Sequence, residues 1–150
     1  MAGVSVLAPA VDAYVLAALD REGLTGLRVS HGYLVQRLLR GPRSVGALAE
    51  DLGISQQAVS KSVAQLADGG YVVVFQDRID GRRRLVELSE RGHRAVARAR
   101  AARAALTDRL VTRVGTEDLV TAGRVVAALG EELGLSTALA GRRVPPPVES

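Results

Sequence analysis

The segment 44–68 restricts the fold of this chain most strongly, because it contains two short helical patterns with room for only a tight turn between them. Apolar side chains recur at helical spacing over residues 45–52 and again over residues 56–68, and Gly53 interrupts the first pattern. A serine stands directly before each pattern, where its hydroxyl can cap the first free N–H groups of a helix. The segment therefore predicts a helix-turn-helix.

The two helices of this segment must be locked together by their apolar sides, and Ala49 is small enough to let them cross closely. The residues predicted to form the lock are Leu48, Leu52, Ile54, Val59, Val63 and Leu66. The side of the second helix that stays uncovered carries Ser55, Gln56, Gln57, Ser60 and Lys61, with no acidic residue on its early turns. Glutamine can pair with adenine, and lysine and serine can contact phosphate, so this side is a candidate DNA-reading surface. A merely solvated polar side is the alternative.

A β-hairpin is predicted after the second helix of the segment. Residues 71–75 are β-branched or aromatic, residues 84–88 alternate charged and apolar side chains, and Asp80-Gly81 is a favourable turn pair. Guanidinium groups crowd this turn, from Arg78, Arg82, Arg83 and Arg84. Because such groups repel one another unless an anion lies between them, we predict a wing that contacts DNA. A solvated arginine cluster is the alternative. Asp80 could hold one arginine in a paired salt bridge.

Further helices are predicted on both sides of this core. We expect the first to begin near Pro9, and the others to be capped by Ser30, Ser89 and Thr116. The predicted fold is mainly α with a small β-hairpin wing (an α+β fold), a winged helix-turn-helix whose terminal helices form a dimerisation region. The predicted parts are an N-terminal dimerisation helix and loop (1–29), a DNA-binding lobe (30–90), a long linker helix with a C-terminal dimerisation helix (91–140), and a mobile tail (141–150).

Composition excludes several classes of protein. With no cysteine among 150 residues, a disulfide framework, a zinc finger and a thiol redox switch are excluded, and the formal net charge of +4 suits a polyanionic partner. His31 and His93 lack metal-ligand spacing, and no phosphate-binding loop or dinucleotide fingerprint is present. We therefore expect no enzyme, no metal and no cofactor. No apolar run approaches the ~20 residues of a membrane span, so we expect a soluble protein with no membrane partner. The absence of cysteine fits a reducing compartment, and we expect the protein to be cytoplasmic.

A more specific pattern joins the wing to the helix that follows it. Asp80-Gly81-Arg82-Arg83 is followed by Leu88-Ser89-Glu90-Arg91-Gly92. Residues 45–92 thereby resemble the MarR family of winged-helix regulators, and the likeness extends over about residues 9–135. It implies that Arg82 enters a minor groove and that the uncovered side of the second helix faces a major groove. Phosphate contacts are expected from Arg43 and Ser44 as well. Gly81 departs mildly from the basic or polar residue frequent there.

A homodimer is expected because the first and last helices are apolar and lie outside the DNA-reading core. The predicted interface residues are Val11, Tyr14, Val15, Leu119, Val126, Leu129 and Leu133. The MarR resemblance implies the same arrangement, and packing within one chain is the alternative. A two-fold dimer predicts a palindromic DNA site with half-sites about 10 bp apart.

The resulting hypothesis is a sequence-specific DNA-binding regulator, more specifically a repressor that occupies a palindromic operator on double-stranded DNA. A winged-helix protein-interaction module and a non-specific DNA binder are the alternatives. The family resemblance also implies a small aromatic or phenolic effector that releases DNA, with a pocket at Tyr14, His31 and Tyr33. Ordinary core packing of the two tyrosines is the competing interpretation.

Overall fold

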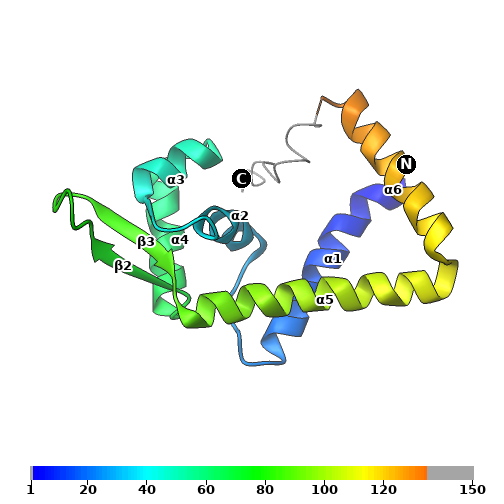
Figure 1. Ribbon diagram of the computed structural model, residues 1–150, viewed down its shortest axis with the longest axis horizontal. Helices are drawn as coiled ribbons and strands as arrows, with labels where there is room; N and C mark the ends of the chain where they lie inside the picture. The colour runs from blue at the N-terminus through cyan, green and yellow to red at the C-terminus, as the bar shows by residue number, and fades with distance from the viewer. Residues whose placement is uncertain (1, 135–150) are drawn as a thin grey trace. The chain divides into compact units, whose positions relative to one another are not determined.

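The computed structural model describes residues 2–134, and the predicted tail at 141–150 lies outside them. The described chain divides into two compact units, with the boundary between Ala102 and Arg103 (Figure 1). The first unit holds the predicted DNA-binding lobe, and the second holds the end of one long helix and the helix after it. No helix within residues 2–134 is long and apolar enough to cross a membrane.

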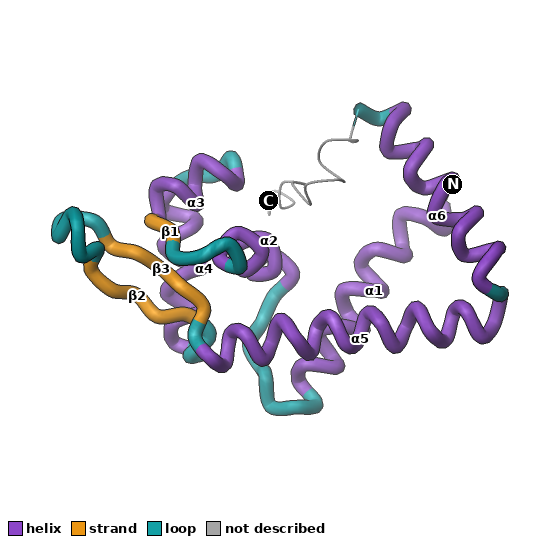
Figure 2. Tube along the Cα trace, in the orientation of Figure 1, coloured by secondary structure: helices purple, strands orange, loops and turns teal. Residues whose placement is uncertain are grey.

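Six helices and three short strands make up the described chain (Figure 2). The helices are α1 (Ala2–Asp20), α2 (Val29–Leu38), α3 (Val45–Leu52), α4 (Gln56–Asp68), α5 (Glu90–Val114) and α6 (Thr116–Glu132). The strands are β1 (Arg43–Ser44), β2 (Val72–Gln76) and β3 (Arg84–Leu88). The prediction of a mainly α winged helix-turn-helix is confirmed.

Two serine caps and a glycine turn, all predicted from the sequence, define the ends of the helices in the helix-turn-helix. The Ser44 hydroxyl accepts the N–H of Ala47 at 3.2 Å, and the Ser55 hydroxyl accepts the N–H of Ala58 at 3.2 Å. Gly53 ends α3 with φ +66°, a left-handed conformation that costs glycine little. Both predicted caps and the predicted turn are therefore confirmed.

The wing is the outer part of a three-stranded antiparallel sheet in the order β1-β3-β2. In the hairpin, Val74 pairs with Val86. On the other edge of β3, Arg43 also pairs with Val86. The strand β1 was not predicted, because a strand of two residues is too short to show an alternating pattern.

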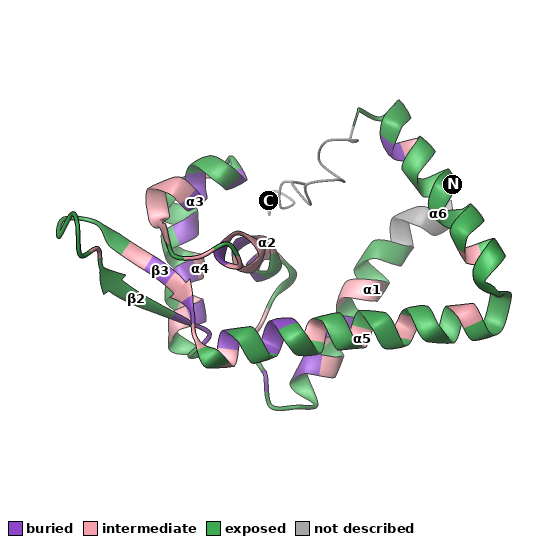
Figure 3. Cartoon of the chain, in the orientation of Figure 1, coloured by how far each residue is buried: buried purple, intermediate pink, exposed green. Residues whose placement is uncertain are grey.

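The core of the first unit is a single apolar cluster that joins the helix-turn-helix to the sheet (Figure 3). Its fully buried members are Leu34, Leu48, Leu66, Val59 and Val86, and all the residues of the predicted lock are buried or half-buried in it. The second half of α1 contributes Val15 and Leu19 to the same cluster. The helix α1, which was expected to lie outside the DNA-reading core, is therefore packed in part within its own chain.

Four predicted boundaries were wrong by a few residues. The helix α1 begins at Ala2 rather than near Pro9, because an internal proline removes only one donor from a helix otherwise rich in apolar helix formers. The helix α2 begins at Val29, because the His31 ring nitrogen Nδ1 accepts the N–H of Arg28 and replaces the expected Ser30 cap. The helix α6 begins at Thr116, because the Gly115 carbonyl accepts its first N–H bond. The strand at 71–75 begins one residue later, at Val72.

Candidate nucleic-acid interface

The recognition helix α4 has one buried side and one open side. Val59 and Leu66 are 0% exposed and Val63 is 6% exposed, which anchors one side of the helix in the core. The predicted reading residues are all exposed, namely Ser55, Gln56, Gln57, Ser60 and Lys61. No acidic residue lies in the first turn, so the positive end of the helix dipole is not neutralised there. This side of α4 presents hydrogen-bonding groups and one cation to the solvent.

The start of α4 lies against the start of α3. The Gln56 side-chain nitrogen Nε2 is 3.6 Å from the position that a Cβ atom at Gly46 would occupy. The Ser55 hydroxyl accepts a backbone N–H as a cap, which leaves its own hydrogen available to an outside acceptor such as phosphate. The two N-termini therefore form one polar edge of the lobe.

Backbone hydrogen bonds fix the tip of the wing. The N–H of Asp77 donates to the Arg83 carbonyl at 2.8 Å, and the N–H of Ile79 donates to the Asp77 carboxylate at 2.9 Å. The Asp80 carboxylate accepts the N–H of Arg82 at 3.1 Å. Asp80 therefore shapes the turn and forms no ion pair with a guanidinium of residues 2–134, which corrects the salt bridge considered from the sequence.

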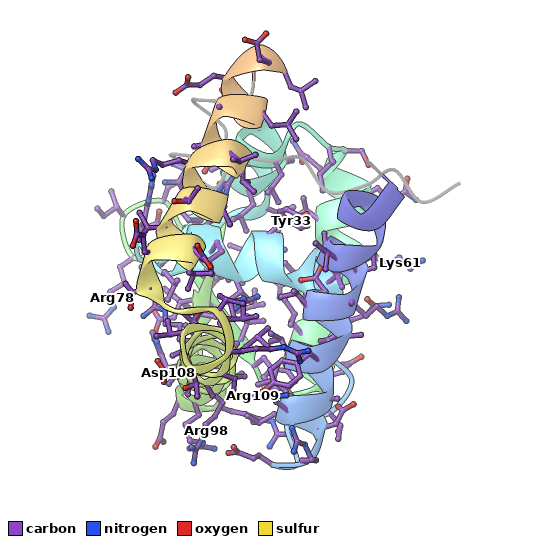
Figure 4. All side chains as sticks on the ribbon, turned by 90° about the vertical axis from the view of Figure 1, so that its right-hand side faces the viewer. Tyr33, Lys61, Arg78, Arg98, Asp108 and Arg109 are labelled. Carbon is purple, nitrogen blue, oxygen red and sulfur yellow. The ribbon has the colours of Figure 1, made fainter. Side chains whose placement is uncertain are left out.

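The wing carries unneutralised positive charge. Arg78, Arg82, Arg83 and Arg84 are all exposed, and none forms an ion pair with any residue within 2–134. Figure 4 shows Arg78 and Lys61 well apart from each other, so the wing and α4 supply two separate cationic points on the first unit.

Arg43 differs from the other predicted phosphate ligands because it already has a carboxylate partner. Its guanidinium forms an ion pair with Asp51 of α3, and the two side chains are each 35% exposed. Ser44, next to it, is half-buried and caps α3. Any phosphate at this edge would meet a cation that Asp51 partly neutralises and holds in one orientation.

The family model of the MarR family matches residues 22–84. That stretch holds the helix-turn-helix, the recognition helix and the arginine-bearing turn described above. Over these residues the chain is similar to the MarR family.

Solved structures share the fold over most of the chain. RV1404 from Mycobacterium tuberculosis has a TM-score of 0.74 at 22% identity, with 86% of each chain covered. The YusO protein from Bacillus subtilis has a TM-score of 0.70 at 18% identity, covering 86% of this chain and 90% of YusO. A MepR mutant from S. aureus, bound to an oligodeoxyribonucleotide, has a TM-score of 0.64 at 14% identity, covering 87% of this chain and 94% of MepR. Identities this low establish a common fold and nothing finer. No match was found among curated protein sequences.

The residues predicted for the MarR-type dimer interface fall into two groups. In the first unit, Val15 is 4% exposed inside its own core, while Val11 and Tyr14 are half-buried. In the second unit, Leu119 and Leu129 are half-buried, and Val126 and Leu133 are 61% and 62% exposed. Further apolar side chains that the prediction omitted are also exposed there, namely Leu110, Val114, Val120 and Val125. The predicted interface residues of the second unit are therefore more exposed than those of the first unit, and an apolar partner would cover more of their surface.

The residues predicted for an effector pocket are engaged in the lobe itself. His31 is 2% exposed; its Nε2 lies 3.1 Å from the Gln65 side-chain oxygen, and its Nδ1 accepts the N–H of Arg28. Tyr14 and Tyr33 pack half-buried against the core cluster. An open hollow occurs elsewhere, in the second unit, and is lined by Leu106, Asp108, Arg109, Leu110, Thr112 and Arg113. The placement of His31 favours a structural role that links α2 to the recognition helix.

Two residues with structural contacts were not identified from the sequence. Asp51 was not recognised as the partner of Arg43, and Arg91 was not recognised as a contact between distant segments. The Arg91 guanidinium donates to the Gly23 carbonyl at 2.7 Å across 68 residues of sequence. Spacing along the chain carries no signal for such a contact.

Proposed function

We propose that this chain is a sequence-specific repressor that binds a palindromic operator on double-stranded DNA as a homodimer. In each subunit, the open side of α4 reads a major groove and the wing places Arg82 in the neighbouring minor groove. The observation that carries the proposal is the set of four exposed wing guanidinium groups that have no ion-pair partner within 2–134. Such groups gain most from the negative potential of a narrow minor groove.

Two further observations support the proposal. Gln57 and Ser60 stand exposed on α4, where they offer directional hydrogen bonds to base edges. MepR, which shares the fold, is described as bound to an oligodeoxyribonucleotide. A binder that recognised only the phosphate backbone would need the wing and not these polar side chains.

Selection from random and genomic DNA at several salt concentrations tests this function. A specific regulator retains a small set of palindromic fragments against excess competitor DNA, with half-sites about 10 bp apart. Equal retention of all fragments would identify a non-specific binder, and the absence of any salt-sensitive retention would identify a protein-interaction module.

The contribution of α4 is tested by Gln57→Ala. We expect this variant to change which fragments are selected while its salt dependence stays close to that of the unaltered protein, because glutamine carries no charge. A uniform loss of affinity for every fragment would contradict a reading role. Repression itself is tested by placing a selected fragment upstream of a reporter gene; increased transcription would point to an activator.

Release of DNA by an aromatic or phenolic effector is a separate proposal that depends on the family resemblance. Titration of such compounds into the complex with a selected fragment tests it. Effector release requires tighter binding to the DNA-free form, so a compound that binds both forms equally would leave the complex intact.

A further inference from the structure

The loop between α1 and α2 is fastened to the lobe at three points. Glu22 pairs with Arg98 of α5 at 2.7 Å. The Gly23 carbonyl accepts a hydrogen bond from Arg91 at 2.7 Å, and the Thr25 carbonyl accepts one from the Tyr71 hydroxyl at 2.8 Å. Three polar contacts within four residues therefore tie a surface loop to α5 and to the residue before β2.

Arg91 is the centre of this arrangement. Its guanidinium carbon lies 4.9 Å from the centroid of the Tyr71 ring, and its Nη2 lies 3.5 Å from the Tyr71 hydroxyl oxygen. Its Nε is buried with no hydrogen-bond partner among the described residues. The orientation of the side chain is therefore set by the tyrosine ring and the Gly23 carbonyl. We name Arg91, Tyr71 and the carbonyls of Gly23 and Thr25 the Arg91 clamp.

Tyr71 in turn is fixed to the end of the recognition helix and to the start of α5. Its N–H donates to the Leu66 carbonyl of α4 at 2.8 Å, and its carbonyl accepts the N–H of Ser89 at 3.0 Å. A Cβ atom at Gly92 would lie only 2.1 Å from the Tyr71 carbonyl oxygen, so α5 packs directly on this backbone. The Arg91 clamp therefore connects the chain leaving α1 with the end of α4.

We propose that Arg91 is a positioning residue that sets how strictly the dimer discriminates the spacing between operator half-sites. This inference depends on the proposed function, specifically on a dimer in which α1 takes part. In that dimer, the direction in which α1 leaves the lobe sets the separation of the two α4 helices. The clamp contributes two of the three polar contacts that fix that direction, and without it the Glu22–Arg98 ion pair and the packing of buried Leu24 hold the loop.

The expected effect follows from duplex geometry. Adding one base pair between half-sites moves them apart by about 3.4 Å and rotates one relative to the other. A rigid dimer loses contacts when the spacing changes, whereas a loosened dimer adjusts. We therefore expect the intact clamp to give at least about a tenfold preference for one spacing, and Arg91→Ala to reduce that preference to about threefold or less.

The experiment measures affinity of the full-length homodimer for a selected operator and for versions with one or two base pairs added or removed. Arg94→Ala is the matched control, because Arg94 is on the same helix and pairs only with Glu90, at 3.3 Å, among the described residues. We expect Arg94→Ala to keep the spacing preference of the unaltered protein. Tyr71→Phe removes only the hydroxyl of the clamp and should give an intermediate preference even if Arg91→Ala fails to fold.

The outcomes separate the two proposals. An unchanged spacing preference in Arg91→Ala, or in Tyr71→Phe where Arg91→Ala does not fold, would overturn the role of the clamp while leaving sequence-specific binding intact. An equal loss of affinity at every spacing would likewise overturn it and show a purely structural contact. Failure of the unaltered protein to select any operator would overturn the proposed function, and the positioning role with it.

Discussion

At the scale of single residues, Gly92 stands at a position where the neighbouring backbone leaves no room for a methyl group. The start of α5 approaches the Tyr71 carbonyl so closely that only glycine fits at position 92. The Ser89 hydroxyl strengthens the same junction, since it donates to the Gly70 carbonyl at 2.6 Å and accepts the N–H of Gly92 at 3.0 Å. The Ser-Glu-Arg-Gly pattern of the sequence therefore has a packing reason independent of DNA.

We expect Gly92→Ala to lower the free energy of unfolding by about 1–3 kcal/mol or more, because backbone atoms must move to admit the new Cβ atom. Urea denaturation measures the change. Gly81→Ala is the control: a Cβ at exposed Gly81 meets nothing within 4 Å, so we expect a change below about 0.5 kcal/mol. Equal stability of the two variants would contradict the close approach at position 92.

The side chain of Arg82, the wing arginine predicted for the minor groove, makes no contact among the described residues that would stabilise the fold of its own subunit. The Arg82 side chain is exposed and has no ion-pair partner within 2–134. We expect Arg82→Ala to leave the unfolding midpoint unchanged, to lower operator affinity about tenfold and to reduce the salt slope by about one. Fluorescence anisotropy with a selected fragment measures both quantities. Full affinity in this variant would remove the wing from the proposed interface.

At the scale of elements, the sequence predicted best what adjacent residues decide. The caps at Ser44 and Ser55 and the turn at Gly53 are each set within a few positions of the chain, and all three were found. The strand β1 was missed, since its pairing with β3 is decided by residues about forty positions away. Arg91 was missed for the same reason, because its partner Gly23 is 68 residues distant.

The link between α2 and α4 gives a prediction about the recognition helix. His31 lies buried between them, with its ring hydrogen-bonded to the Gln65 side chain. We expect His31→Leu to lower the free energy of unfolding by about 1–3 kcal/mol, because Gln65 and the N–H of Arg28 lose their partner. Combining it with Gln65→Leu should recover part of the loss. Additive losses in the double variant would contradict a direct bond.

At the scale of the whole molecule, the exposed apolar side chains that favour a homodimer are concentrated in the second unit. Val125 and Val126 of α6 are 65% and 61% exposed, and further apolar side chains are exposed on α5 and α6. A monomer rarely leaves so many apolar side chains in water on one pair of helices. This supports the proposed homodimer, although Val15 of α1 is already covered by its own chain.

We expect Val126→Glu to convert the dimer into monomers at micromolar concentration, since a charge would enter an apolar contact. Sedimentation velocity measures the assembly state. Val73→Glu is the matched control: Val73 is 46% exposed, and it lies on β2 of the wing. Dissociation by both variants alike, or by neither, would argue against an interface centred on α6.

The position of β3 has a consequence for how binding must be mapped. This strand pairs with β1 on one edge and with β2 on the other, so the residue that caps α3 and the arm of the wing share one backbone ladder. If nucleic acid contacts only β1 or only β2, it will also slow amide exchange in the other strand, because both are hydrogen-bonded to β3. Amide-exchange maps alone will therefore mark more residues than the nucleic acid contacts. Substitution of individual side chains is needed to distinguish direct contact from reduced backbone motion.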